Sequence, residues 1–333
     1  MMPRSRTKTL RPLEEVLAPP RPDAVASMVR HELGADLLAL MSDSFINNVH
    51  ANEDGSVFVR RADGREVAVG FELSAERRRA ILNSFAALLD TSIHAERPSL
   101  AGKLPIWDFR LQGTVEPLTT APQFVLRKPS RKLLRLGDLL AQKVLEPLEA
   151  VLLRDAVEAR RNVIVAGAAD AGKTTFVNAL LAHLLFERPG ERLVVIEEEA
   201  RELRLEGRNV VRLQTCAGYD ARELLRIALR ENPSRIILGE ARGAECYDWL
   251  RAANTGHAGG FLTLHANSAH DVLERMADMV AEAGVRPNLR RIARTVDLVV
   301  FLEHDEASGK RRVKELLEVH DRPGGVKLER ASL

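Results

Sequence analysis

The sequence has little cysteine, few aromatic residues and no long apolar run, and each shortage excludes a class of protein. Cys216 and Cys246 are the two cysteines among 333 residues, too few for a disulfide framework or a four-thiolate zinc site and typical of a reducing compartment. No stretch reaches the roughly 18 consecutive apolar residues that a spanning helix needs. We therefore expect a cytoplasmic protein without spanning helices.

Charge and aromatic content also argue against a protein that grips nucleic acid directly. The 49 Lys and Arg residues against 47 Asp and Glu leave a net charge of +2, and aromatic residues make up 4% of the chain. Single-stranded nucleic acid is usually held by a basic groove with aromatic stacking platforms. We expect no direct sequence-specific nucleic-acid binding.

Composition divides the chain into four segments. Residues 1–22 hold five basic residues among five prolines, which predicts a loose basic tail rather than an export signal, because no apolar core follows the basic start. Residues 23–127 are predicted to form an N-terminal α+β domain, and residues 128–136 a basic linker. Residues 137–333 are predicted to form a nucleotide-binding domain.

The pattern of the first domain is mixed. Apolar residues at helical spacing predict a helix over 23–41, and alternation over 57–71 predicts a hairpin. Ser74 can cap a second helix, and residues 109–113 and 124–127 look like two further strands.

The second domain alternates strand-like runs with helical patterns. Such βα alternation predicts an α/β fold with a mainly parallel sheet covered on both faces. The predicted strands are residues 163–166, 193–196, 236–238, 261–264 and 298–302.

One motif in this domain matches a phosphate-binding P-loop at every position. The loop consists of Gly167, Ala168, Ala169, Asp170, Ala171, Gly172, Lys173 and Thr174, followed by Thr175. A strand precedes it and a helix follows, so backbone amides and the helix N-terminus can surround phosphates while Lys173 reaches them and Thr174 ligates Mg²⁺. The motif predicts binding of ATP with Mg²⁺.

Acids and histidines follow other strands of the same domain. Glu197, Glu198 and Glu199 follow one strand and Glu240 another, where a carboxylate can hold Mg²⁺ through water or orient the attacking water. Glu199 and Glu202, taken singly, are also explained as surface acids. His257 and His265 bracket a Gly-rich turn and a strand end, where an imidazole can sense a γ-phosphate.

Four motifs in this order resemble the ATPases of bacterial type II and type IV secretion and of type IV pili. They are GAADAGKTT, VVIEEEAREL, LRENPSRIILGEARGAE and TGHAGGFLTLHAN. The resemblance covers about residues 100–320. The conjugal-transfer branch is indicated by chain length, by FRLQG followed by TAPQFVLRKPS, and by TGHAGG.

The resemblance implies a RecA-like C-terminal domain, a smaller PAS-like N-terminal domain and a homo-hexameric ring. It further implies that Glu197 and Glu240 are the catalytic acids and that His257 and His265 form a histidine box. Arg110 and Arg127 match N-domain arginines that reach nucleotide phosphates. Inner-membrane components of a secretion apparatus are the implied partners, with peripheral contact at the inner membrane as an open possibility.

Three features depart from the family pattern. The acidic box has Glu197, Glu198 and Glu199 where Glu-Asp is usual, which leaves open which carboxylate orients water. Asp170 and Ala171 replace small Gly or Ser residues of the P-loop. The four-cysteine module of type II members is missing from this sequence, which disfavours that branch.

The function predicted is an ATPase motor for a conjugative or type IV secretion apparatus. The alternatives are a motor for type IV or tight-adherence pili, a RecA-like nucleic-acid translocase, and a nucleotide-binding scaffold without turnover.

Overall fold

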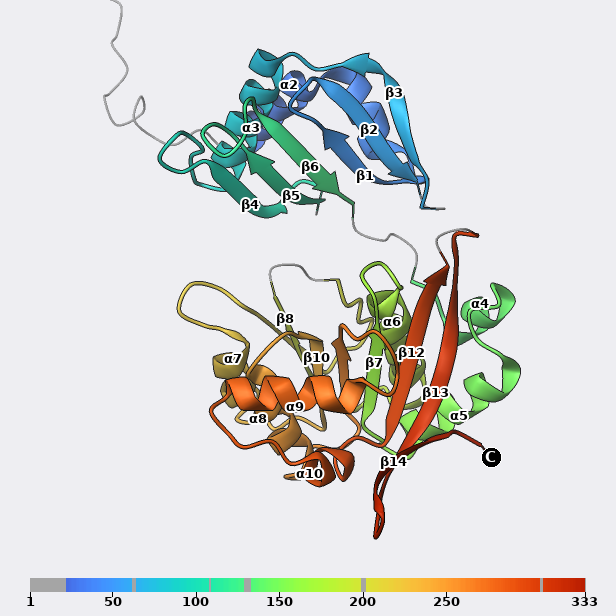
Figure 1. Cartoon of the computed structure of the whole chain (residues 1–333). Coiled ribbons are helices and arrows are strands. Elements are labelled where there is room, and N and C mark those ends of the chain that lie inside the picture. The colour runs from blue at the N-terminus through green and yellow to red at the C-terminus, as the bar shows by residue number, and fades with distance from the viewer. Residues whose placement is uncertain are drawn as a thin grey trace, which may run out of the picture. The chain divides into compact units, whose positions relative to one another are not determined.

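The computed structural model describes residues 22–61, 64–107, 109–128, 133–198, 202–305 and 308–332. The chain divides into two compact units, the first containing α2 through β6 and the second α4 through β14 (Figure 1). Apart from Pro22, the predicted tail lies outside the described residues, as do positions 129–132 of the predicted linker.

The first unit is a six-stranded antiparallel sheet with two helices. The strand order is β3-β2-β1-β6-β5-β4. The elements are α2 (Pro22–Ser42), β1 (Ile46–Ala51), β2 (Ser56–Arg61), β3 (Glu66–Glu72), α3 (Ala75–Leu88), β4 (Ser99–Leu104), β5 (Phe109–Thr114) and β6 (Gln123–Arg127). Apolar residues of both helices and of the inward-facing strand positions form a single core cluster.

The predicted helices and strands of this unit are confirmed, and two strands are added. The side chain of Ser74 caps α3 by accepting the backbone N–H of Arg77 at 3.2 Å. Neither β1 (INNVHA) nor β4 (SLAGKL) was predicted, because Asn and Gly are poor strand formers and mask the alternation. Hydrogen-bonded pairing of β1 with β2 and β6, and of β4 with β5, holds both segments as strands.

The second unit is an eight-stranded sheet in the order β14-β13-β12-β7-β11-β10-β8-β9. The six strands from β12 to β9 are parallel, which confirms the predicted mainly parallel sheet, while β13 and β14 add an antiparallel edge. The strands are β7 (Val163–Gly167), β8 (Leu193–Glu197), β9 (Val210–Gln214), β10 (Arg235–Ala241), β11 (Phe261–Leu264), β12 (Leu298–Asp305), β13 (Lys310–Arg322) and β14 (Gly325–Arg330).

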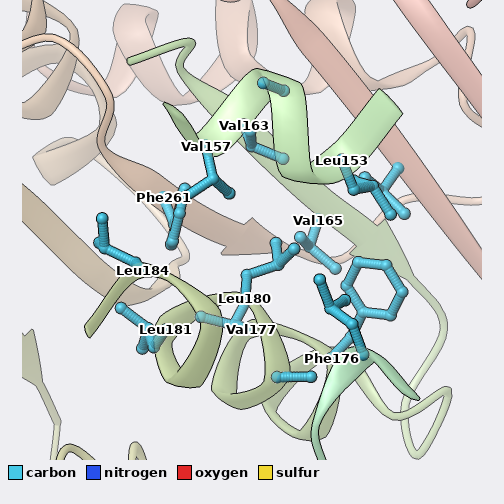
Figure 2. Packing of buried hydrophobic residues seen from close by; sticks show 14 of the residues in the cluster. Leu153, Val157, Val163, Val165, Phe176, Val177, Leu180, Leu181, Leu184 and Phe261 are labelled. Carbon is cyan, nitrogen blue, oxygen red and sulfur yellow. The ribbon is translucent and has the colours of Figure 1, made fainter. Parts of the chain in front are cut away.

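Helices cover both faces of this sheet, as predicted. The helices are α4 (Leu136–Ala141), α5 (Pro147–Glu158), α6 (Lys173–Glu187), α7 (Ala221–Ala228), α8 (Glu245–Ala253), α9 (Val272–Glu282) and α10 (Leu289–Ala293). Val163 and Val165 of β7 pack with α4, α5 and α6, whereas Ile164 and Ala166 pack with α7 through α10. Figure 2 shows the first of these cores, with Phe176 and Leu180 of α6 against β7. A buried layer on each face holds β7, and the first of these layers also holds α6, so both ends of the loop between them are fixed.

Candidate nucleotide site

The chemistry-bearing residues gather at the carboxyl edge of the parallel strands. The P-loop follows β7, Glu240 lies near the end of β10, and His265 follows β11, which pairs with both strands. Because parallel strands end at the same edge, these side chains can meet. The distances between their polar atoms show that they do.

The loop between β7 and α6 depends on glycine at two positions. Gly167 has φ of +153°, and a Cβ there would lie 2.4 Å from the carbonyl oxygen of Leu302. Gly172 has φ of +94° and begins α6 in a left-handed conformation that Cβ disfavours. Asp170 is also left-handed, at φ of +58°, and its carbonyl accepts a hydrogen bond from Arg311 Nε at 2.9 Å.

Other P-loop residues differ in how they meet solvent. Ala168, Ala169 and Asp170 are exposed, while Ala171 is buried. Thr174 and Thr175, in the first turn of α6, are half-buried. The exposed part of the loop, residues 168–170, therefore carries its one acidic side chain, and α6 begins three residues later.

Lys173 is held by the loop that it belongs to. It is 8% exposed, and its Nζ donates to the carbonyl oxygens of Gly167 at 3.1 Å and Ala168 at 2.9 Å. Burial lowers the pKa of Lys173, while the negative charges of Glu240 and Asp170 oppose that shift.

His265 connects Lys173 to Glu240. Its Nδ1 lies 3.2 Å from Lys173 Nζ, and its Nε2 lies 2.8 Å from Glu240 Oε1. An ammonium only donates, so Nδ1 accepts the hydrogen of Lys173 Nζ. The predicted lysine, histidine and acid thus lie in one row of polar contacts.

Arg242, which the sequence motifs did not indicate, extends these contacts to a second acid. Its Nη2 lies 2.6 Å from Glu240 Oε2, and its Nη1 lies 2.5 Å from Glu198 Oε2. In the sequence, only its position two residues after Glu240 indicates that it could contact that acid. One guanidinium therefore links Glu198, which follows β8, to Glu240, near the end of β10.

Glu197 is directed to backbone rather than to this row of contacts. It is 6% exposed, and its Oε1 accepts the backbone N–H groups of Glu202 at 2.7 Å and Leu203 at 2.8 Å. Glu202 in turn accepts a hydrogen bond from Thr174 Oγ1 at 3.3 Å. Glu199 lies outside the described residues.

The protonation of Glu197 is expected to affect stability in a definite direction. Burial raises its pKa above the ordinary value of 4.5, against the opposing backbone hydrogen bonds, so the native state loses stability as pH rises from 4.5 through the folded pKa. In Glu197→Gln the amide oxygen can still accept both N–H groups, and this loss is removed. In urea unfolding, the free energy of unfolding of the variant should increase relative to that of the wild type as pH rises. Exposed Glu206→Gln should follow the wild type at every pH, and a gap that stays constant or closes for Glu197→Gln contradicts the expectation.

A β-bulge directs Glu240 toward the P-loop. Leu238 pairs with Leu262 and Ala241 with Leu264, so β10 has one extra residue opposite Thr263. Thr263 is 2% exposed and its Oγ1 donates to the carbonyl oxygen of Gly239 at 2.6 Å. This bond fixes the bulge that carries Glu240.

Replacing Thr263 by valine should therefore misplace Glu240 without altering the P-loop. We expect kcat for ATP hydrolysis to fall about 10-fold with KM within about twofold, because the positioning of a reacting group is lost and the phosphate contacts are kept. Thr263→Ser keeps the hydroxyl and should restore kcat to within about threefold. Wild-type kcat in the valine variant, which keeps the methyl group, together with a loss in the serine variant would show that the methyl packing matters and the hydrogen bond does not.

The structure places His257 at the other edge of the sheet. It precedes β11, and its Nδ1 lies 2.9 Å from the carbonyl oxygen of Pro233, which precedes β10. The following turn is fixed there by Asn162, whose Oδ1 accepts the N–H groups of Gly259 and Gly260 at 2.8 and 3.0 Å. Within one chain, His257 is therefore not brought to Lys173.

Arg110 and Arg127 belong to the first unit. They are directly opposite each other on the antiparallel strands β5 and β6, and so lie on the same face of that sheet. Lys103 is opposite Arg110 on β4. Neighbouring strands lie about 4.8 Å apart, so this row concentrates positive charge.

No helix among the described residues is long and apolar enough to cross a membrane.

The comparisons with known proteins agree with the motifs. A model of the family described as type II/IV secretion system protein matches residues 35–325. The conjugal transfer protein TrbB of Rhizobium radiobacter is 34% identical over 292 residues, which cover 87% of this chain and 89% of the relative.

Two further relatives extend this agreement. The type IV secretion system protein PtlH of Bordetella pertussis is 33% identical over 311 residues, covering 82% of this chain and 89% of the relative. The crystal structure of the Legionella pneumophila ATPase DotB is similar in fold, with a TM-score of 0.61, 20% identity, and 84% and 79% of the two chains covered. The resemblance predicted from the four motifs is confirmed, and the chain belongs to the type II/IV secretion system protein family.

Proposed function

We propose that the chain is the ATPase motor of a conjugative or other type IV secretion apparatus, with a RecA-like second unit and a PAS-like first unit. The observation that carries this is the row of polar contacts from Lys173 of the P-loop through His265 to Glu240. It joins the phosphate-binding lysine to an acid that can act on water or metal. Relatives named for conjugal transfer and type IV secretion support the cellular role.

ATP with Mg²⁺ is the proposed ligand. The hydroxyl of Thr174 and the carboxylate of Glu240, through water, would hold the metal, and both are the hard oxygen ligands that Mg²⁺ prefers. The bound metal supplies charge neutralisation at the β- and γ-phosphates. The backbone of residues 167–172, Lys173 and the first turn of α6 with Thr175 would hold the phosphates.

In the hydrolytic step, the chain's own groups have separate roles. Glu240 is the proposed base or water-orienting residue, and His265 holds its Oε1 while Arg242 holds its Oε2. Glu198 and Glu197, on the neighbouring strand, remain candidates for the same function. His257 is proposed to act between subunits of a homo-hexamer, since its edge of the sheet lies away from the P-loop.

The first unit would supply charge to the same reaction. Arg110 and Arg127 are proposed to reach nucleotide phosphates, where guanidinium groups stabilise the charge that spreads over the γ-phosphoryl oxygens. Their hydrolysis-dependent contact would move the first unit. Cytoplasmic location, peripheral contact with the inner membrane, and inner-membrane components of the apparatus as partners belong to the same proposal.

Glu240→Gln tests the proposed role of the acid. The amide keeps shape and hydrogen bonding but accepts a proton poorly, so kcat should fall about 10²-fold while ATP affinity stays within about threefold. Phosphate release and fluorescent nucleotide binding measure the two quantities. Unchanged kcat would remove Glu240 from the reaction and return the role to Glu197 or Glu198.

A further inference from the structure

The β12–β13 hairpin extends past the edge where β7 ends and the P-loop begins. Leu302 of β12 is opposite Gly167, the last residue of β7, and β12 continues to Asp305. At about 3.3 Å per residue, the three further residues add roughly 10 Å of strand. Arg311 of β13 is opposite His304 in this extension. The hairpin therefore brings an arginine that none of the four motifs contains to the P-loop.

Arg311 meets the P-loop at two residues. Its Nε donates to the carbonyl oxygen of Asp170 at 2.9 Å. Its Cδ lies 3.1 Å from the position that a Cβ on Gly172 would occupy, so the arginine stem covers that glycine. Asp170 has a left-handed backbone, at φ of +58°, which aspartate adopts less readily than glycine. The hydrogen bond from Arg311 therefore stabilises a turn that the residue at its centre does not favour.

Asp170 also adds a negative charge where nucleotide phosphates are proposed to bind. This charge acts on Lys173, because it opposes the lowering of the lysine pKa by burial. A carboxylate beside the phosphates weakens their binding, and a cation next to the carboxylate reduces that repulsion. The guanidinium of Arg311 is bonded to the backbone of Asp170, so it lies within one side-chain length of the carboxylate of that residue.

We propose that Arg311 is a positioning residue of the P-loop, which holds the Asp170 turn and offsets the charge of this acid so that the loop accepts a nucleoside triphosphate. This inference rests on the proposed function. The arginine is needed because the loop has an acid where a small residue is usual, and a glycine at that position would remove both needs. Arg311 thus acts through Asp170 and is not assigned to the reacting atoms.

The test measures nucleotide affinity in two backgrounds. A non-hydrolysable ATP analogue with Mg²⁺ is titrated into the purified full chain and followed by calorimetry. Arg311→Ala should weaken its binding about 10-fold, because a charge-assisted hydrogen bond and a compensating charge are lost. In a chain that carries Asp170→Gly, the same substitution should weaken binding by no more than about twofold, since glycine adopts the left-handed turn and has no charge to offset.

Steady-state kinetics and a matched control separate this role from a general structural one. In Arg311→Ala, KM for ATP should rise about 10-fold while kcat stays within about twofold, because the contacts among Lys173, His265 and Glu240 are kept. Arg312→Ala removes the next residue of β13, which pairs with Glu303 at 2.7 Å, and should match the wild type.

The possible results separate the two proposals. A loss of affinity confined to the chain with Asp170 supports the inference. Affinity within twofold of wild type in Arg311→Ala overturns the inference alone. So does an equal loss in the Asp170→Gly background, which would show that the arginine does not act through Asp170. A wild-type chain that binds no analogue overturns the proposed function and the inference with it.

Discussion

Replacement of Lys173 by alanine is expected to reduce kcat for ATP about 10²- to 10³-fold. The ammonium lies inside the P-loop, held by the carbonyl oxygens of Gly167 and Ala168. It is the positive charge that can follow the phosphoryl oxygens as charge develops on them. Its removal also leaves His265 Nδ1 without its donor, so the imidazole that contacts Glu240 is held less firmly.

Two comparisons make this result specific. Lys327→Ala removes an exposed lysine of β14 and should leave kcat within about twofold. Lys173→Arg keeps the charge but replaces a compact ammonium by a planar fork and should recover little of the lost rate. Wild-type kcat in Lys173→Ala would contradict the assignment of the P-loop as the reaction site.

Replacement of Arg235 by alanine should have the largest effect on stability, a loss of about 3–5 kcal/mol in the free energy of unfolding. Arg235 is 0% exposed at the amino edge of β10. Its Nε donates to Glu191 Oε2 at 2.6 Å, and its Nη1 donates to the carbonyl oxygen of Val157 at 2.8 Å. Truncation leaves the carbonyl oxygen of Val157 without this donor, and it leaves the carboxylate of Glu191 only partly paired. Burial lowers the pKa of Arg235, while its bond to Glu191 opposes that shift.

Urea unfolding followed by circular dichroism measures this loss. The matched control is Arg226→Ala, which breaks an exposed ion pair with Glu223 one turn away on α7 and should cost no more than about 0.5 kcal/mol. A loss below about 1 kcal/mol in Arg235→Ala would mean that water replaces the guanidinium and that the network at this edge is not structural.

Much of the site could be predicted because strand direction determines it. The runs before Lys173, Glu240 and His265 are mostly apolar and buried, as expected of strands covered on both faces. Parallel strands then bring their following residues to one edge. The same rule separates His257 from His265, because one precedes β11 and the other follows it, so they lie at opposite edges of the sheet.

The rest depends on local geometry that pattern does not encode. Thr263 acts through a bulge, and a one-residue change of register is invisible in the alternation of apolar residues. Arg242 and Glu202 reach the site from loops, where side-chain direction follows local backbone angles rather than a repeating period. The antiparallel strands β13 and β14 were missed because charged residues interrupt their apolar positions.

The most direct test of the account is steady-state phosphate release by the purified wild-type chain with ATP and Mg²⁺ over a range of protein concentrations. We expect hydrolysis that requires Mg²⁺ and rises more steeply than linearly with protein concentration, as the proposed assembly of a ring requires. ATP binding without phosphate release at every concentration would contradict it.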